Sequence, residues 1–198
     1  MNIVTAFRKS ALLFAATLLA ATASAQTSTW KIDPVHSGIE FKVRHLGVSN
    51  VHGTFTHPTG IVHLDEKDIV KSSVEATIDA TTVTTNETAR DNHLKSDAFF
   101  NIAKYPTIAF KSTSLSKAGG KLTLTGDLTL TGVTKSVTLA LDGPAPPQTD
   151  AKSGMTRSGF SATGTLHRSD FNFGPGFPPA AIGNDVEFTI DIEMDKQP

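Results

Sequence analysis

Three side chains that can transfer protons or bind charge stand together in the middle of the sequence: Arg90, Asp91 and His93. A histidine beside a carboxylate is suited to general acid–base catalysis, and an arginine can hold an anionic group by charge-assisted hydrogen bonds. The same residue types also form structural ion-pair clusters that carry out no chemistry. The cluster therefore allows three interpretations: a structural cluster, a headgroup-binding site or a catalytic site.

The rest of the sequence gives the catalytic interpretation little support. The nearest match to a nucleophile elbow is the stretch 159–163, which lacks the final glycine, and its Ser161 lies on the polar row of an alternating segment. The sequence contains no phosphate-binding loop, no dinucleotide fingerprint and no cysteine. We therefore expect a protein that is not an enzyme and that needs no cofactor.

Five of the seven histidines lie between His36 and His63. None of them forms an H-x-H or H-E-x-x-H metal motif. Strand parity points His45 and His57 inward, which suggests that they meet inside one barrel end. No third or fourth ligand can be named, so we expect hydrogen bonding there and no metal, with a zinc site at His45 and His57 as the alternative.

The elements that must position the charged cluster are a short helix and a set of strands. The run Thr84-Thr85-Asn86-Glu87 fits a capping box, which predicts a helix directly after it. Leu94 and Ala98 would form its apolar side, and Phe99 with Phe100 would end it with two rings that need burial. Such a helix can cover one open end of a barrel and present its charges at the rim.

Apolar and polar residues alternate with period two in most of the remaining chain, as in 122–130 and 186–195. Glycine- and proline-containing turns separate the alternating rows. We predict eight strands at 30–45 (bent near Pro34), 51–65, 72–82, 107–115, 121–130, 133–141, 156–168 and 185–194. These strands favour an all-β fold, an eight-stranded antiparallel β-barrel with a short helix at one end. A two-sheet sandwich is the alternative.

The polar rows contain many charged side chains, which would face lipid in an outer-membrane barrel, so the apolar rows must face inward. Small residues such as Gly126 and Gly164 on these rows either leave a long apolar tunnel or make room for bulky neighbours in a filled core, and the pattern leaves both open. The residues expected to line a tunnel are Phe41, Val43, Phe55, Ile78, Phe110, Phe160, Phe188 and Ile190.

Residues 1–25 have the features of a secretory signal peptide, with a basic pair, an apolar run and a small-residue end before Gln26. We expect cleavage between Ala25 and Gln26, a single domain over 26–198 and a periplasmic or secreted location. Without Arg8 and Lys9, 16 basic residues remain against 19 acidic ones. The absence of a basic cluster in the sequence argues against nucleic acid and against an anionic membrane surface as partners.

Several stretches resemble one family, and they occur in the expected order along nearly all of residues 26–198. They are Trp30-Lys31-Ile32-Asp33-Pro34-Val35-His36-Ser37, Phe41-Lys42-Val43-Arg44-His45-Leu46-Gly47, Arg90-Asp91-Asn92-His93-Leu94, Tyr105-Pro106, the stretch 126–135, and Arg168-Ser169-Asp170-Phe171. The sequence is similar to the YceI-like family. This resemblance implies a lipocalin-like barrel, mostly periplasmic or secreted, that binds polyisoprenoids, isoprenoid quinones or fatty amides. It implies no enzyme.

One departure from the family concerns the loop after Phe171. Asn172 and Phe173 stand before Gly174, where the family usually has glycine at once, so this proline-rich loop brings extra aromatic surface to a barrel end. Ligand identity is therefore left open.

These observations lead to a hypothesis: an exported carrier, store or scavenger that binds a long-chain isoprenoid or acyl lipid in its tunnel, without integral membrane association. His45, Arg90, Asp91 and His93 are the candidates for contact with a headgroup at the rim. The alternatives are a structural or interaction barrel with a filled core, and a lipid-acting enzyme that uses Arg90, Asp91 and His93. A homodimer is compatible with either kind of barrel.

Overall fold

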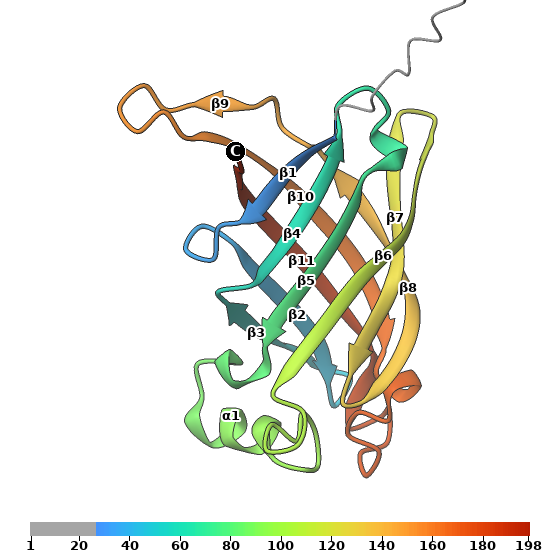
Figure 1. The fold of residues 1–198 in the computed structure, drawn as a ribbon. Coiled ribbons are helices and arrows are strands. Elements are labelled where there is room, and N and C mark those ends of the chain that lie inside the picture. Colours follow the sequence, from blue (N-terminus) through green and yellow to red (C-terminus); the bar gives the residue numbers. More distant parts are fainter. Residues whose placement is uncertain (1–26) are drawn as a thin grey trace, which may run out of the picture.

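The computed structural model describes residues 27–198, so the predicted signal peptide lies outside the described residues. Backbone hydrogen bonds join eleven strands into one antiparallel sheet that closes on itself (Figure 1). The strands are β1 (Thr27–Ile32), β2 (Gly38–His45), β3 (Ser49–Thr56), β4 (Thr59–Asp65), β5 (Ser73–Asp79), β6 (Thr107–Ala118), β7 (Lys121–Leu130), β8 (Val133–Asp142), β9 (Gln148–Thr149), β10 (Thr156–His167) and β11 (Ile182–Lys196).

The long last strand, β11, shows why eleven strands make an eight-stranded barrel. On one edge it pairs with β2 over 182–191 and with β1 over 194–196, so β1 and β2 share one position in the barrel. In the same way β3 pairs with β2 while β4 pairs with β1, so these two share the next position. The other edge of β11 pairs with β10 and closes the sheet. The predicted eight-stranded antiparallel barrel is confirmed.

The predicted strand 30–45 is divided into β1 and β2 where a bend near Pro34 was expected, and the predicted strand 51–65 was wrong as a continuous element. The first is interrupted at 33–37 and the second at 57–58. Pro34 and Pro58 explain both interruptions, because a proline has no N–H to donate to a sheet. The chain at His57 also takes a left-handed conformation, with φ of 57°.

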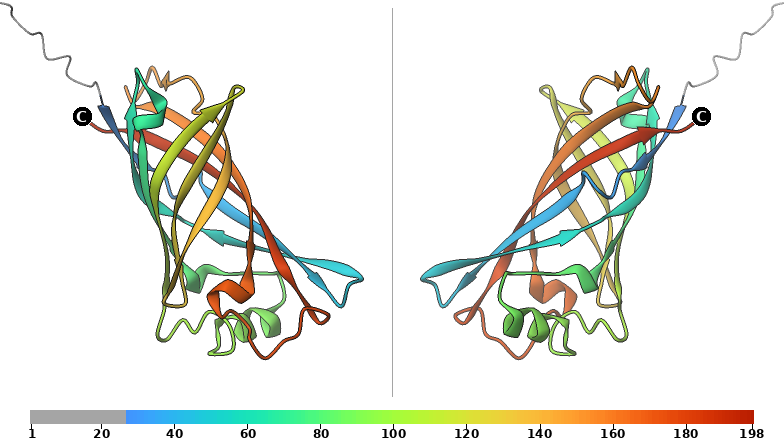
Figure 2. Two further views of the ribbon diagram at one scale, coloured as in Figure 1. Left: turned by 90° about the vertical axis from the view of Figure 1, so that its right-hand side faces the viewer. Right: turned by 90° about the vertical axis from the view of Figure 1, so that its left-hand side faces the viewer.

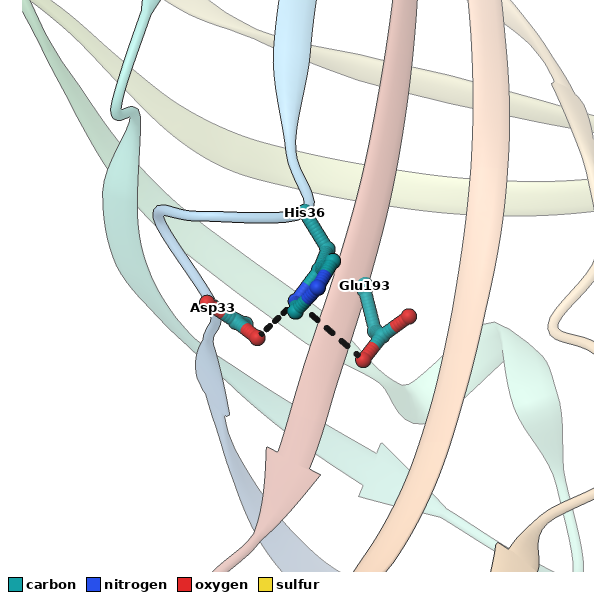
Figure 3. A group of neighbouring side chains, drawn as sticks. All are labelled: Asp33, His36 and Glu193. Carbon is teal, nitrogen blue, oxygen red and sulfur yellow. Dashed lines mark hydrogen bonds and ion pairs between the residues drawn. The ribbon is translucent and has the colours of Figure 1, made fainter.

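The first interruption is held against β11 by side chains (Figure 3). His36 Nδ1 lies 2.7 Å from Asp33 Oδ2 and 3.8 Å from Glu193 Oε1. The Ser37 hydroxyl accepts a hydrogen bond from the Glu193 N–H at 3.0 Å, in place of a strand carbonyl. The hydrogen bond with Asp33 raises the pKa of His36, and the same bond lowers the pKa of Asp33.

The helix α1 (Thr88–Lys95) and the segment after it lie across one end of the barrel, at the bottom of Figure 1. The predicted capping box was wrong. Glu87 is the N-cap, and its carboxylate accepts from the Ala89 N–H. The helix ends at Lys95, so Ala98 does not belong to its apolar side. No helix among residues 27–198 is long and apolar enough to cross a membrane.

At this end of the barrel, Phe99 and Phe100 pack on the loop that follows the 3-10 helix η3 (Arg168–Phe171). The Phe100 ring centroid lies 4.6 Å from that of Phe173, and the Phe99 ring stacks on Phe177 at 5.1 Å. Both Phe99 and Phe100 are buried, as expected from the sequence. Two shorter 3-10 helices, η1 (Ile69–Lys71) and η2 (Ala80–Thr82), flank β5.

Arg168 organises the loop on which these rings pack. The residue is only 4% exposed, and its guanidinium donates to five backbone carbonyls at distances from 2.6 to 3.0 Å: those of Phe173, Gly174, Phe177, Ile182 and Gly183. No carboxylate among residues 27–198 forms an ion pair with it. Burial therefore lowers the pKa of Arg168. Five aligned donors are the full capacity of an arginine, which a lysine cannot supply.

Arg168→Lys should therefore destabilise the protein by about 2–4 kcal/mol, because at least two carbonyls lose their buried donor. Urea unfolding followed by circular dichroism measures this loss. The matched control is Arg157→Lys, at a partly exposed ion pair with Asp195, where we expect a change of at most about 1 kcal/mol. Equal losses in the two variants would contradict the role assigned to Arg168.

The pair of His36 and Asp33 predicts a small pH dependence of stability. A raised histidine pKa in the folded state stabilises the fold below the ordinary pKa of about 6.5 and loses this effect as the pH rises through the raised value. His36→Asn should therefore lower Tm at pH 5.5, where Asp33 remains ionised, more than at pH 9. Thermal unfolding at the two pH values checks this, with His52→Asn as the control. An equal change in Tm between pH 5.5 and pH 9 for the two variants would contradict a stabilising pair of His36 and Asp33.

Candidate functional site: an apolar cavity inside the barrel

The barrel encloses a cavity of about 510 Å³. Residues from all eight strand positions line it, together with residues from α1, from the segment 99–100 and from the loop after η3. This volume lies within the usual range of about 300–1,000 Å³ for small-molecule sites. The barrel is therefore hollow, and the filled core considered as an alternative is not what the structure has.

All eight residues predicted to face a tunnel lie on the wall of this cavity. They come from six strands: Phe41 and Val43 (β2), Phe55 (β3), Ile78 (β5), Phe110 (β6), Phe160 (β10), and Phe188 and Ile190 (β11). The alternating pattern identified the inward face of these strands correctly. Whether these side chains contact a ligand remains a prediction.

Inward glycines decide how the phenylalanine rings pack. A Cβ on Gly53 would lie 2.3 Å from the ring of Phe41, and one on Gly164 would lie 2.6 Å from the ring of Phe188. In both cases the two residues are direct partners on neighbouring strands. Each ring thus occupies the space above a glycine, against the wall. The inward glycines therefore make room for bulky rings, as the interpretation of a filled core assumed. An open shaft also remains, as the interpretation of an apolar tunnel assumed.

Polar side chains gather at only one end of the cavity. Among residues 27–198, no acidic side chain lines the cavity, and the five polar residues in its lining are all basic: Arg44, His45, Arg90, His93 and Arg168. Arg44 and His45 end β2, Arg90 and His93 belong to α1, and Arg168 begins η3. We call this end, the one crossed by α1, the mouth. An apolar shaft with a basic mouth suits an amphiphilic molecule.

Arg90 is oriented by neighbours on its own segment. Its Nε donates to Thr85 Oγ1 at 2.7 Å and its Nη2 to the Thr85 carbonyl at 3.0 Å. The Thr85 hydroxyl in turn donates to Asp91 Oδ1 at 2.6 Å. Arg90 forms no ion pair among residues 27–198, so its charge at the mouth is not neutralised by a contacting carboxylate.

Of the four residues predicted to contact a headgroup at the rim, Asp91 is the one that does not line the cavity. Its carboxylate accepts from the Thr85 N–H and from the hydroxyls of Thr84 and Thr85. Desolvation by partial burial acts in the opposite direction, but these hydrogen bonds lower the pKa of Asp91. Asp91 is thus an ionised acceptor that fixes Thr85, and through it Arg90. Its role is structural, as one of the three original interpretations proposed.

His93 packs among aromatic rings at the mouth. Its ring centroid lies 5.0 Å from that of Phe99 and 5.7 Å from that of Phe177, both in edge-on arrangements. Asp91 is two residues away on the same helix, where side chains do not face each other. The helix therefore does not place the Asp91 carboxylate against the His93 ring, as an acid–base pair would require.

The predicted meeting of His45 and His57 was wrong. His45 pairs with Ser49 beside the turn between β2 and β3, whereas Thr56, just before His57, pairs with Gly38 at the far end of β2. Seven residues of strand, roughly 23 Å, separate these positions. Parity fixes the face of a sheet on which a residue lies, but not its height along the barrel. His57 forms a hydrogen bond with Thr56 Oγ1 and does not line the cavity.

Within residues 27–198, one group of three potential metal ligands has its donor atoms within 4.8 Å of one another: Asp33, His36 and Glu193 (Figure 3). None of the three lines the cavity. Arg157 Nε lies 3.2 Å from Glu193 Oε1, so a cation already contacts the carboxylate oxygen that a metal would need. The ion pairs at the interrupted strand account for this group.

The serine and histidine on the polar row of β10 do not form a catalytic group. Ser161 donates to the Asp191 carboxylate, while His167 Nδ1 lies 2.8 Å from Asp185 Oδ1. Six residues of strand, roughly 20 Å, separate Ser161 from His167. Both pairs lie outside the cavity lining, on the outward row expected from the sequence.

The residues at the mouth that were not predicted as site residues include Arg44, Arg168, Phe173 and Phe177. Alternation with Phe41 and Val43 would place Arg44 on the outer face, but Arg44 lines the cavity at the end of β2, where the pairing with β11 is irregular between Ile182 and Val186. The extra aromatic residues after Phe171 were the available signal for Phe173 and Phe177. Arg168 gave no signal of burial, since its five acceptors are backbone carbonyls of 173–183, which only the folded loop brings together.

Comparisons with known proteins agree with this architecture. The model of the YceI-like domain matches residues 30–194. Protein YceI of Escherichia coli O6:H1 is 42% identical over 180 residues, which cover 90% of this chain and 92% of that protein.

Two solved structures have the same fold. The YceI protein of Campylobacter jejuni is 31% identical with a TM-score of 0.69, covering 79% of this chain and 91% of its own. A domain from Saccharophagus degradans, described as polyisoprenoid binding, aligns with a TM-score of 0.61, covering 85% of this chain and 98% of its own. Its identity is 14%, so this likeness concerns the fold alone. The match over 30–194 and the E. coli relative are decisive: the chain belongs to the YceI-like family.

Proposed function

We propose that this protein binds one long-chain hydrophobic molecule, with an isoprenoid or acyl chain, inside the barrel. The observation that carries the proposal is the cavity of about 510 Å³ inside the barrel, whose lining is apolar everywhere except at a basic mouth. The task would be that of a carrier, store or scavenger. The signal-like residues 1–25 support a periplasmic or secreted location as part of the same proposal.

The dimensions of the cavity favour a chain-like ligand. Along β11 the lining runs from Ile182 to Ile192, roughly 33 Å of strand, or about 25 Å of height after tilt. Each methylene buried from water contributes about 0.8 kcal/mol at most. An extended chain can therefore offset the entropy cost of association without a strong polar anchor.

The relatives are consistent with this ligand class without defining it. The S. degradans domain is described as polyisoprenoid binding and has the same fold. Within the proposal, a polyisoprenoid, an isoprenoid quinone and a fatty acid or amide all suit an apolar shaft. A homodimer is a further expectation, which a measurement of subunit number addresses.

Catalysis is not part of the proposal. Asp91 bonds to threonines rather than to His93, and Ser161 lies on the outer face of the barrel. At the mouth, Arg90 and His93 instead have positions suited to contacting a headgroup, with His45 and Arg44 nearby. Activity on a lipid substrate that disappears in His93→Ala would favour the enzyme alternative.

Native mass spectrometry of the freshly purified protein, combined with solvent extraction, tests the proposal. We expect a bound lipid, and uptake of a fluorescent fatty-acid or prenyl probe by the emptied protein. Ala162→Phe, which places a ring inside the shaft, should reduce probe uptake at least about tenfold, since part of the apolar contact is lost.

The matched control for this test is Thr163→Phe, on the next residue of β10 and therefore on the outer face. It should leave uptake unchanged. Absence of lipid, of probe uptake and of any difference between the two variants would refute the proposal.

Arg90→Gln tests contact with a headgroup. If Arg90 holds an anionic group, this variant should weaken binding of a long-chain fatty acid about tenfold, as expected for one charged hydrogen bond, and should leave the matching fatty alcohol unaffected. Competition against a fluorescent probe gives both affinities. The control is Lys95→Gln, on the same helix but outside the lining. Equal losses for acid and alcohol would contradict a headgroup contact.

A further inference from the structure

The turn between β2 and β3 exposes two large apolar side chains. Leu46 is 58% exposed and Val48 is 76% exposed. The turn is closed by a hydrogen bond from the Val48 N–H to the His45 carbonyl, at 3.0 Å. We call residues 46–48 the hairpin tip.

The local structure does not explain a leucine at this position. Leu46 has φ of 51°, in the left-handed region that favours glycine and asparagine and disfavours bulky residues. Its side chain also gains little packing, because most of it faces solvent. A bulky apolar residue that neither the backbone nor packing favours indicates a contact with a partner.

The hairpin tip lies beside the mouth of the cavity. Arg44 and His45, which directly precede it, line the mouth. The Leu46 N–H donates to the Ala181 carbonyl at 2.9 Å, and Ala181 lines the cavity as well. Figure 2 shows this hairpin, in cyan, projecting from the wall at the end of the barrel crossed by α1.

The surroundings of the hairpin tip are basic. The Arg44 side chain donates to Asn50 Oδ1 and forms no ion pair among residues 27–198. On the facing part of β11, Glu187 forms an ion pair with Lys42 at 2.9 Å, and Asp185 Oδ1 lies 2.8 Å from His167 Nδ1. The unpaired Arg44, and Arg90 across the mouth, leave positive charge at this end.

We propose that the hairpin tip docks the protein reversibly on a bilayer surface that contains anionic lipids. Leu46 and Val48 enter the headgroup region, and Arg44 contacts lipid phosphates, as in other interfacial anchors. Docking places the mouth against the bilayer. This inference rests on the proposed function, because a long-chain ligand resides in membranes rather than in water and must enter the shaft from there.

The sequence argued against an anionic surface as partner, because no run of basic residues occurs. The fold changes this, since Arg44 and Arg90 come from distant segments and both lie at one end of the cavity. Two apolar side chains and one arginine provide a weak, reversible attachment, which suits a protein that exchanges cargo.

Co-sedimentation with vesicles tests the docking. The purified protein should bind vesicles of phosphatidylethanolamine with phosphatidylglycerol and should bind vesicles of phosphatidylcholine alone less. The double variant Leu46→Ser/Val48→Ser should lower the partition coefficient at least about fivefold, since the inserted apolar surface is lost. Arg44→Gln should lower it about fivefold at low salt and by less at high salt.

Val35→Ser is the matched control, because Val35 is 73% exposed but lies in the interruption between β1 and β2, away from the lining. It should bind vesicles as the unchanged protein does. Equal binding by the unchanged protein and the double variant would overturn the docking proposal. So would a homodimer that binds no vesicles and dissociates in the double variant, because the hairpin tip would then be covered by a second copy.

Uptake of a fluorescent fatty acid in vesicle-free solution separates this proposal from the proposed function. Leu46 and Val48 do not line the cavity, so the double variant should take up the probe normally. Failure of vesicle binding with normal probe uptake would refute docking alone. Failure of the unchanged protein to take up the probe would refute the proposed function, on which docking rests.

Discussion

The whole architecture depends on the packing of phenylalanine rings over glycines on the inner wall. A barrel of eight strands has room for either a solid core or a narrow cavity, depending on the side chains that face inward. Phe41 over Gly53 and Phe188 over Gly164 bury large apolar rings without extending them to the axis. The wall thus supplies the apolar contacts that stabilise the barrel, and the shaft remains open.

The end crossed by α1 is stabilised by buried hydrogen bonds and aromatic packing, whereas the wall is stabilised by apolar packing. Backbone carbonyls of the loop after η3 converge on one buried cation, Arg168, and aromatic rings from two segments pack over them. Because no carboxylate lies in the lining, this end combines an apolar interior with positive charge. The same arrangement that orders the loop therefore sets the chemical character of the entrance.

Much of the fold could be predicted from the alternation of apolar and polar residues, because each strand has one solvent-exposed face and one buried face. That is why eight strand positions and eight wall residues were identified by parity. Parity contains no information on height, however, so His45 and His57 were placed together although a whole strand separates them. The interruptions at 33–37 and 57–58 coincide with Pro34 and Pro58, a local signal that was used only in part. The burial of Arg168, by contrast, depends on five carbonyls that only the fold of the loop 173–183 brings around its guanidinium. A local pattern cannot specify such partners.

The position of β11 has a consequence for how the molecule is assembled. This strand is made last, yet β1, β2 and β10 all use it as their neighbour. Until residues 182–196 pair with them, the early strands and β10 each have an unpaired edge, and the interior is an open trough. Closure is thus a late, non-local step, which is slow to form and leaves strand edges prone to aggregation until it is complete.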